Sequence, residues 1–373
     1  MNFSISDDHQ MLKDSAQVFL DKQVSLKPLL TPGATVRDAG YAANWAKIAE
    51  MGWPGLLIPE DYGGAGLSCI DLVMIVEELG RTLAPSPFLG TLLGTLAVMK
   101  GGDATQKSRV LPRIALGEIA LALAAAEADG REDGPDRQTR ASQHGGWRIT
   151  GRKAFVIDAA EAQMLVVTAR TDASAARRLF LVDAGQAGVQ VAIEPWRDIT
   201  RQVCTVTLDD AEAEPLDAAG DALWPWVRDR ALLALSAENA AGLRHVLDVT
   251  ADYARQRVAF GRPIGAYQAI KHGLADMLGQ AECARTATLY AAWALSEENP
   301  RGPLAAAMAK AYSSDAYVEA AHRSIQIFGA IGFTWEMPNH LYLKRARANA
   351  ELFGAPREHR SRVIDLARAE LAA

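Results

Sequence analysis

The chain has 373 residues, of which 49% are apolar, 23% charged and 7% aromatic, which is typical of a folded protein of two or three domains. Its 39 lysines and arginines against 45 acidic residues give a net charge of −6, which argues against a nucleic-acid partner bound through phosphates. The three cysteines lie far apart without metal-ligand spacing, and no apolar run is long enough to span a membrane. Since the first residues are acidic and polar, unlike a signal peptide, we expect a cytoplasmic protein without a bound metal.

Residues 1–115 carry apolar side chains at three- and four-residue spacing, which predicts an N-terminal helical domain. Helical segments are expected over 7–24, 41–53 and 69–83. A glycine-rich turn at 58–68 interrupts them, and the third segment should end at the proline-containing residues 84–87.

Residues 116–219 are different, because short runs with β-branched side chains follow one another with polar turns between them. No helical period separates these runs, so the pattern predicts a middle antiparallel β-barrel or sandwich. Residues 220–373 are again helical, with long stretches rich in alanine and leucine. Such helices typically pack as a bundle, so we predict an α+β fold of three domains that ends in a four-helix bundle at a subunit interface.

The segment between 253 and 272 carries the clearest motif. It ends one long helix, turns through Phe260 and Gly261, and begins another helix. A second segment, 326–336, follows a helix and is rich in glycine, and a third glycine-rich turn lies at 59–68. Arginine and backbone N–H groups suit the pyrophosphate of a dinucleotide, and glycine allows the backbone to approach it closely.

In this order, around a central β domain, the three segments resemble the acyl-CoA dehydrogenase family. The family element R-x-x-F-G…Q is matched by Arg257, Phe260, Gly261 and Gln268. The element Q-x-x-G-G-x-G-F is matched by Gln326, Gly329, Gly332 and Phe333, with Ala330 at the second glycine. The resemblance implies FAD as the cofactor and implies that both segments contact the ADP half of a flavin housed mainly in a neighbouring subunit.

The resemblance also implies that the β domain of the chain holds the isoalloxazine ring. Phe155 stands where the family has a tryptophan against the flavin, and it can still stack on a ring. Ile157 replaces a hydroxyl residue and cannot form a hydrogen bond to the flavin. The turn at Ala126 and Glu127 departs from the Thr-Glu of the family.

Dehydrogenation of a thioester requires a base that takes the α-proton, and a carboxylate with a raised pKa suits this task. The two positions at which the family places this glutamate are occupied by Phe353 and Ala231. Glu238 lies two helical turns after Ala231 on an apolar stripe, so it is a candidate for the base. The alternatives are an ion pair with an arginine or a wet interface. Glu127 and Glu351 are weaker candidates, expected to be solvated turn residues.

Features that serve the chain's own flavin are weakened, whereas those that serve a neighbour's flavin are intact. This pattern is similar to the short subunits of heterotetrameric, steroid side-chain acyl-CoA dehydrogenases. We predict FAD-dependent α,β-dehydrogenation of an acyl-CoA in fatty acid or steroid side-chain β-oxidation, with transfer of electrons to an electron-transfer flavoprotein by a homo- or heterotetramer. The alternatives are a non-catalytic subunit that completes a partner's FAD site, and a flavin monooxygenase or nitroalkane-oxidase relative. The basic run Lys344, Arg345 and Arg347 is expected on a solvated helix face rather than at the CoA phosphates.

Overall fold

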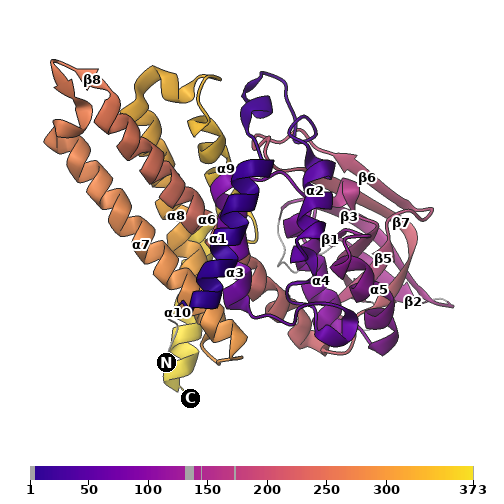
Figure 1. Cartoon of the computed structure of the whole chain (residues 1–373). Coiled ribbons are helices and arrows are strands. Elements are labelled where there is room, and N and C mark those ends of the chain that lie inside the picture. Colours follow the sequence, from indigo (N-terminus) through magenta and orange to yellow (C-terminus); the bar gives the residue numbers. More distant parts are fainter. Residues whose placement is uncertain (1–4, 131–137, 144, 172–173, 373) are drawn as a thin grey trace.

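The computed structural model describes residues 5–130, 138–143, 145–171 and 174–372. Figure 1 shows helices at one side of the molecule, a strand-rich region at the other, and the N-terminal helices α1 and α3 between them. None of the helices in these ranges is long and apolar enough to cross a membrane.

Three of the N-terminal helices, α1, α3 and α5, begin at a capping box. The bounds of the N-terminal helices are α1 (Asp7–Gln23), α2 (Tyr41–Glu50), α3 (Cys69–Thr82), α4 (Phe88–Gly101) and α5 (Ala104–Ala115). The Ser68 hydroxyl accepts backbone N–H groups of the first turn of α3, and the Asp71 side chain accepts the Ser68 N–H in return. Helix α4 is buried over nearly its whole circumference, which agrees with its apolar sequence.

The middle region forms a single sheet that closes on itself. Its strands are β1 (Leu121–Ala124), β2 (Arg140–Gln143), β3 (Trp147–Ile157), β4 (Met164–Thr171), β5 (Ser174–Asp183), β6 (Val189–Ile193) and β7 (Val203–Pro215). The pairings run β4-β2-β3-β7-β5 and return to β4, so the predicted barrel is confirmed. Most pairings are antiparallel, as predicted, whereas β4 pairs in parallel with both β1 and β2.

The C-terminal region consists of long helices with a small hairpin between the first two. Its elements are α6 (Leu223–Gln256), β8 (Val258–Ala259), β9 (Arg262–Pro263), α7 (Gln268–Ser296), α8 (Gly302–Phe328), α9 (Asn339–Glu351) and α10 (Pro356–Ala372). Short 3₁₀ turns are η1 (Lys27–Leu30), η2 (Trp53–Gly55), η3 (Glu60–Tyr62), η4 (Ala159–Glu161), η5 (Gly220–Ala222), η6 (Ile264–Ala266) and η7 (Gly329–Phe333). Helices α6, α7 and α8 pack against one another, and α9 and α10 pack on α8.

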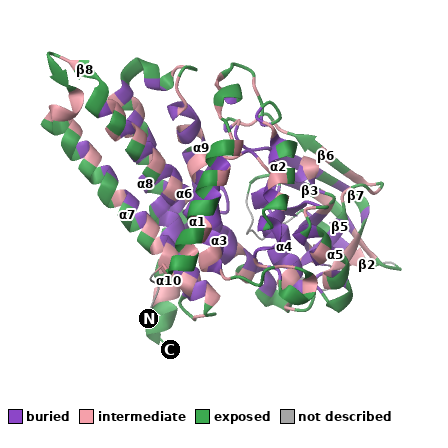
Figure 2. Cartoon of the chain, in the orientation of Figure 1, coloured by how far each residue is buried: buried purple, intermediate pink, exposed green. Residues whose placement is uncertain are grey.

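Buried side chains form distinct clusters that follow these regions. One fills the barrel, one lies within the bundle, and the largest joins the N-terminal helices to β1 and α6. Figure 2 shows that the contact between α3 and α6 is buried, whereas the hairpin β8–β9 is exposed. The N-terminal helices are therefore the layer that attaches the barrel to the bundle.

Candidate cofactor and active site

The two dinucleotide motifs meet at one end of the bundle, far from both chain termini (Figure 1). The rings of Tyr253 and Phe328 stack with centroids 4.0 Å apart, and the Tyr253 hydroxyl donates to the Phe328 carbonyl. Tyr253 lies one turn before Arg257 and Phe328 directly before Gly329, so this stack joins the end of α6 to the end of α8, where the two segments begin.

This end of the bundle presents polar groups that have no partner in the chain. The side chains of Arg257, Gln268 and Gln326 are exposed, and within the described residues none forms a hydrogen bond or an ion pair. Phe260 is 96% exposed at the tip of the hairpin, next to Gly261, and Phe333 of η7 is also exposed. A guanidinium, two amides and exposed apolar side chains fit the pyrophosphate and adenosine of a dinucleotide held against a second subunit.

Two glycines shape the loop that follows α8. Gly329 has φ 71° and ψ −149°, a conformation open essentially only to glycine. A Cβ atom on buried Gly332 would lie 2.7 Å from that of Phe328, so a side chain there would separate the loop from the helix. The glycines thus set the shape of this loop and its packing on α8, and their approach to a dinucleotide stays a prediction.

The barrel presents an aromatic pair to its surroundings. Phe155, near the end of β3, is 41% exposed and has a left-handed backbone with φ 53°. Its ring meets Trp196 edge to face at 5.7 Å. The indole N–H of Trp196 is buried and has no acceptor among the described residues. An exposed aromatic ring with an indole donor beside it fits the ring of a flavin, although the sequence did not single out Trp196.

Two described residues at which the family has hydrogen-bonding side chains offer none to such a ring. Ala126 and Ile157 are both buried and apolar. Glu127 was expected to be a solvated turn residue, which is wrong: it is buried, and Lys153 donates to its carboxylate at 2.7 Å. The same carboxylate accepts the Thr139 hydroxyl, so Glu127 serves to hold the first turn of the barrel to β3.

Both positions at which a base was sought are apolar and buried. Ala231 lies in the core of α6, and Phe353 packs into the same cluster with a left-handed backbone, φ 57°. His359 Nε2 lies 2.9 Å from the Phe353 carbonyl, and burial together with the charge of Lys310 lowers the pKa of His359 to about 4. The imidazole is therefore neutral near pH 7 and donates to this carbonyl. Glu351, as expected, is exposed.

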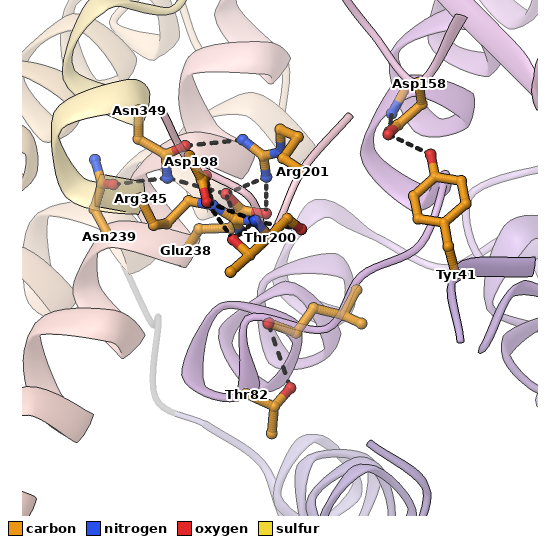
Figure 3. A network of polar contacts seen from close by, with 12 residues as sticks. Tyr41, Thr82, Asp158, Asp198, Thr200, Arg201, Glu238, Asn239, Arg345 and Asn349 are labelled. Atoms are coloured by element: carbon orange, nitrogen blue, oxygen red, sulfur yellow. Dashed lines mark hydrogen bonds and ion pairs between the residues drawn. The ribbon is translucent and has the colours of Figure 1, made fainter. Parts of the chain in front are cut away.

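Glu238 belongs to a buried network of charged groups (Figure 3). Arg201 Nη2 donates to both carboxylate oxygens of Glu238 at 2.7 and 2.8 Å, and Asn349 Nδ2 donates to one of them at 3.0 Å. The ion pair with an arginine was one of the alternatives that the sequence left open. Helix α3 crosses α6 closely here, since a Cβ atom on Gly80 would lie 2.6 Å from the Cα of Glu238.

A second ion pair lies beside the first. Arg345 Nε donates to Asp198 Oδ2 at 2.6 Å, and Arg345 Nη2 donates to the Thr200 hydroxyl at the same distance. The expectation of a solvated helix face is therefore wrong for Arg345, which points into the protein, and holds for exposed Arg347. A guanidinium stays charged when it is buried with a carboxylate, whereas sequence patterning assigns a basic run to solvent.

The charges of the network set the protonation of its acids. Burial pushes the pKa of the Glu238 carboxyl up, but the charges of Arg201 and Arg345 and the hydrogen bonds from Arg201 and Asn349 hold it below its usual value. Asp198 has a lowered pKa for the same reasons, with Arg345 as its main partner. A base for an α-proton needs a raised pKa, so the geometry of Glu238 is that of an ion-paired carboxylate.

The chain thus combines an N-terminal helical layer, a closed barrel and a bundle of long helices. Models of the acyl-CoA dehydrogenase N-terminal, middle and C-terminal domains match residues 6–118, 122–210 and 229–365. The chain is 32% identical to acyl-CoA dehydrogenase IpdE2 of Mycobacterium tuberculosis, over 94% of this chain and 95% of that protein. It is 28% identical to the human mitochondrial short-chain specific acyl-CoA dehydrogenase, over 91% and 85% of the two chains.

Solved structures show the same fold. A steroid ACAD variant, Tcur3481-Tcur3483, superposes with a TM-score of 0.88 and 29% identity over 99% of this chain and 100% of that chain. The ChsE4-ChsE5 complex from Mycobacterium tuberculosis gives a TM-score of 0.85 and 26% identity over 100% and 99%. The chain belongs to the acyl-CoA dehydrogenase family, and the predicted resemblance to its steroid-type branch is confirmed.

Proposed function

We propose that the chain binds FAD and takes part in the α,β-dehydrogenation of an acyl-CoA thioester to the enoyl-CoA. The observation that carries this proposal is the pair of separate surfaces that fit the two halves of FAD. One is the exposed, unpartnered set of donors at the end of the bundle, and the other is the aromatic pair on the barrel. Bound FAD would supply the acceptor for the hydride that leaves Cβ of the substrate.

The residues of the chain have separate tasks in this proposal. Arg257, Gln268 and Gln326 hold the pyrophosphate and adenosine of a flavin shared with a neighbouring subunit, and Phe260, Gly261, Gly329 and Gly332 shape that surface. Phe155 stacks on the isoalloxazine ring, with Trp196 as an additional donor. Within this scheme Glu238 is the candidate base only if the carboxylate leaves Arg201, because its present partner lowers its pKa.

A second candidate function is favoured by the absence of a free carboxylate at the described base positions. Phe353 and Ala231 are buried apolar residues, and Glu238 is ion-paired. The chain would then be a non-catalytic subunit that completes the FAD site of a partner, which supplies the base. The exposed end of the bundle suits this role because the hairpin β8–β9 lies at the side of the molecule away from the chain's own barrel (Figure 1).

The physiological setting is also a proposal. The similarity to IpdE2 and to a steroid ACAD supports an acyl-CoA from fatty acid or steroid side-chain β-oxidation. A structure described as the electron transferring flavoprotein of Acidaminococcus fermentans contains a chain of the same fold, 27% identical, which supports such a flavoprotein as the electron acceptor. We further propose a tetramer, homo- or heteromeric, in the cytoplasm.

The amount of bound flavin separates the two candidates. We would purify the chain alone and together with an acyl-CoA dehydrogenase subunit encoded beside it, and measure flavin absorbance and its bleaching by acyl-CoA. Flavin on the chain alone that bleaches supports a self-sufficient enzyme. A colourless chain that gains flavin only with the partner supports the second candidate. No flavin and no bleaching in either preparation would contradict both.

Glu238→Gln tests the base. If Glu238 takes the α-proton, single-turnover bleaching by acyl-CoA slows by about 100-fold or more while flavin binding persists. An unchanged bleaching rate would remove Glu238 from the reaction and leave it as the partner of Arg201. Exposed Glu297→Gln at the end of α7 is the matched control and should leave the rate unchanged.

A further inference from the structure

The carboxylate of Asp158 lies fully buried between the barrel and the N-terminal helices. It follows β3 directly, with a left-handed backbone at φ 63°. The Tyr41 hydroxyl, from the first turn of α2, donates to Oδ1, and the Gly90 N–H, from α4, donates to Oδ2 at 3.1 Å. Figure 3 shows the pair of Asp158 and Tyr41 set apart from the charged network.

Helix α4 packs closely against Asp158 because Gly90 has no side chain. A Cβ atom on Gly90 would lie 2.8 Å from the Ile157 carbonyl and 2.9 Å from the Asp158 Cβ, closer than side chains approach. Glycine at this point therefore lets α4 reach the end of β3 and place its N–H on the carboxylate. The backbone N–H of Asp158 donates to the Gln202 carbonyl at 3.1 Å, which ties the same residue to the start of β7.

This anchor lies next to the segment that carries Phe155. The pairing of β3 with β7 shifts register twice, between Ile149 and Gly151 and again between Lys153 and Val156. Phe155 falls in the shifted stretch and has a left-handed backbone, so the ladder does not fix its direction. On its C-terminal side the segment is held by the pairing of Val156 and Ile157 with β7 and, directly after them, by Asp158, which joins the end of β3 to two helices and to the start of β7.

We propose that Asp158, clamped by Tyr41 and Gly90, is a positioning residue that holds the end of β3 so that Phe155 faces the flavin ring. This inference rests on the proposed function, because it assumes FAD on the barrel of this chain. Asp158 itself is buried and does not touch the cofactor. Its hydrogen bonds fix the backbone between residues 155 and 158. They also hold the barrel at a fixed distance from α2 and α4.

The clamp consists of Asp158, Tyr41 and Gly90, and two conservative variants each alter one of its hydrogen bonds. Tyr41→Phe removes the hydroxyl donor and keeps the carboxylate, and Asp158→Asn keeps an acceptor for Tyr41 but turns an amide toward the Gly90 N–H. The matched control is Tyr342→Phe, because the buried Tyr342 hydroxyl also joins two regions, donating to the Arg81 carbonyl at 2.8 Å, away from β3. All three remove a buried hydrogen bond between regions, so their melting temperatures should fall by similar amounts.

The readout is the bound flavin of the flavin-containing preparation, measured by FAD affinity, the visible absorption band and the quenching of flavin fluorescence. We expect Tyr41→Phe and Asp158→Asn to bind FAD at least about threefold more weakly and to shift the band, and Tyr342→Phe to match the wild type. Wild-type affinity and spectrum in both clamp variants would overturn this inference while leaving the proposed function intact. A wild-type protein without flavin, alone or with its partner, would overturn the proposed function and this inference together.

Discussion

The end of the bundle and the network around Glu238 use the same residue types in opposite ways. At the end of the bundle, Arg257 and two glutamines are exposed, and no described residue of the chain pairs with them. In the network, Arg201 and Arg345 are buried, and each is matched by a carboxylate. Donors without a partner are available to a ligand, whereas matched and buried charges hold segments of the chain together.

This contrast distinguishes residues that can bind a ligand from residues that stabilise the fold, and it does not depend on sequence motifs. An exposed arginine can be removed with little loss of folding stability, since water already solvates it. Removing one member of a buried ion pair leaves the other charge uncompensated, which destabilises the fold strongly. The following variants test each half of the contrast.

The largest effect is expected for Glu238→Ala. The change leaves Arg201 buried without its carboxylate, so the free energy of unfolding should fall by about 3–5 kcal/mol. Denaturant titration followed by circular dichroism measures this loss. Exposed Glu351→Ala is the control and should lie within about 0.5 kcal/mol of the wild type. A loss at Glu238 as small as in the control would show that the network does not hold the helices together.

A smaller effect is expected from the titration of Asp158. Burial raises the pKa of its carboxyl from 3.8 to about 6, although the Tyr41 hydroxyl and the charges of Arg201 and Arg345 oppose the shift. A raised pKa means that the folded state binds the proton more tightly, so this group's contribution to stability is full below pH 3.8 and is lost as pH rises through 6. Relative to Asp158→Asn, which cannot titrate, the wild type should lose roughly 2–3 kcal/mol between pH 4 and 7. Denaturant titrations of both proteins at several pH values measure the difference, and parallel profiles would contradict the assignment.

The smallest effect on folding is expected for Arg257→Ala, which tests the exposed half of the contrast. The unfolding free energy should stay within about 0.5 kcal/mol of the wild type. FAD affinity of the assembled protein should fall about 10- to 100-fold, because a charge-assisted contact is lost. Arg255→Ala is the control, since exposed Arg255 already pairs with Asp252 and lies two residues before the motif. Equal FAD affinity in the two variants would remove Arg257 from the cofactor site.

The sequence predicted a helix or strand well where residues next to it in the chain determine where it begins and ends. The helix expected over 69–83 is observed as Cys69–Thr82, because Ser68 caps its start and prolines follow its end. Strand β2 was not expected, since residues 140–143 are polar and form a strand only through pairing with β3 and β4. The period of the long helix placed Glu238 inward, but no local pattern could identify Arg201 as its partner.

The candidate site shows the same difference between residues in short motifs and residues whose contacts come from distant segments. The motifs located the donors at the end of the bundle because each motif is a short segment with fixed spacing. Trp196 and Asp158 were not found, since each acquires its surroundings from distant segments: Trp196 meets Phe155, and Asp158 meets Tyr41 and Gly90. Their environment is a property of the assembled fold, and a single sequence carries no direct signal of it.

The charged network also has a consequence for the order in which the chain is made. The contact of Arg345 with Asp198 spans 147 residues, and that of Arg201 with Asn349 spans 148. During synthesis the N-terminal helices and the barrel leave the ribosome well before α9 does. Until α9 has been synthesised, Asp198 and Arg201 lack their partners on that helix. This interface between the barrel and the bundle therefore forms late. A nascent or truncated chain that ends before α9 would expose this interface to chaperones and proteases.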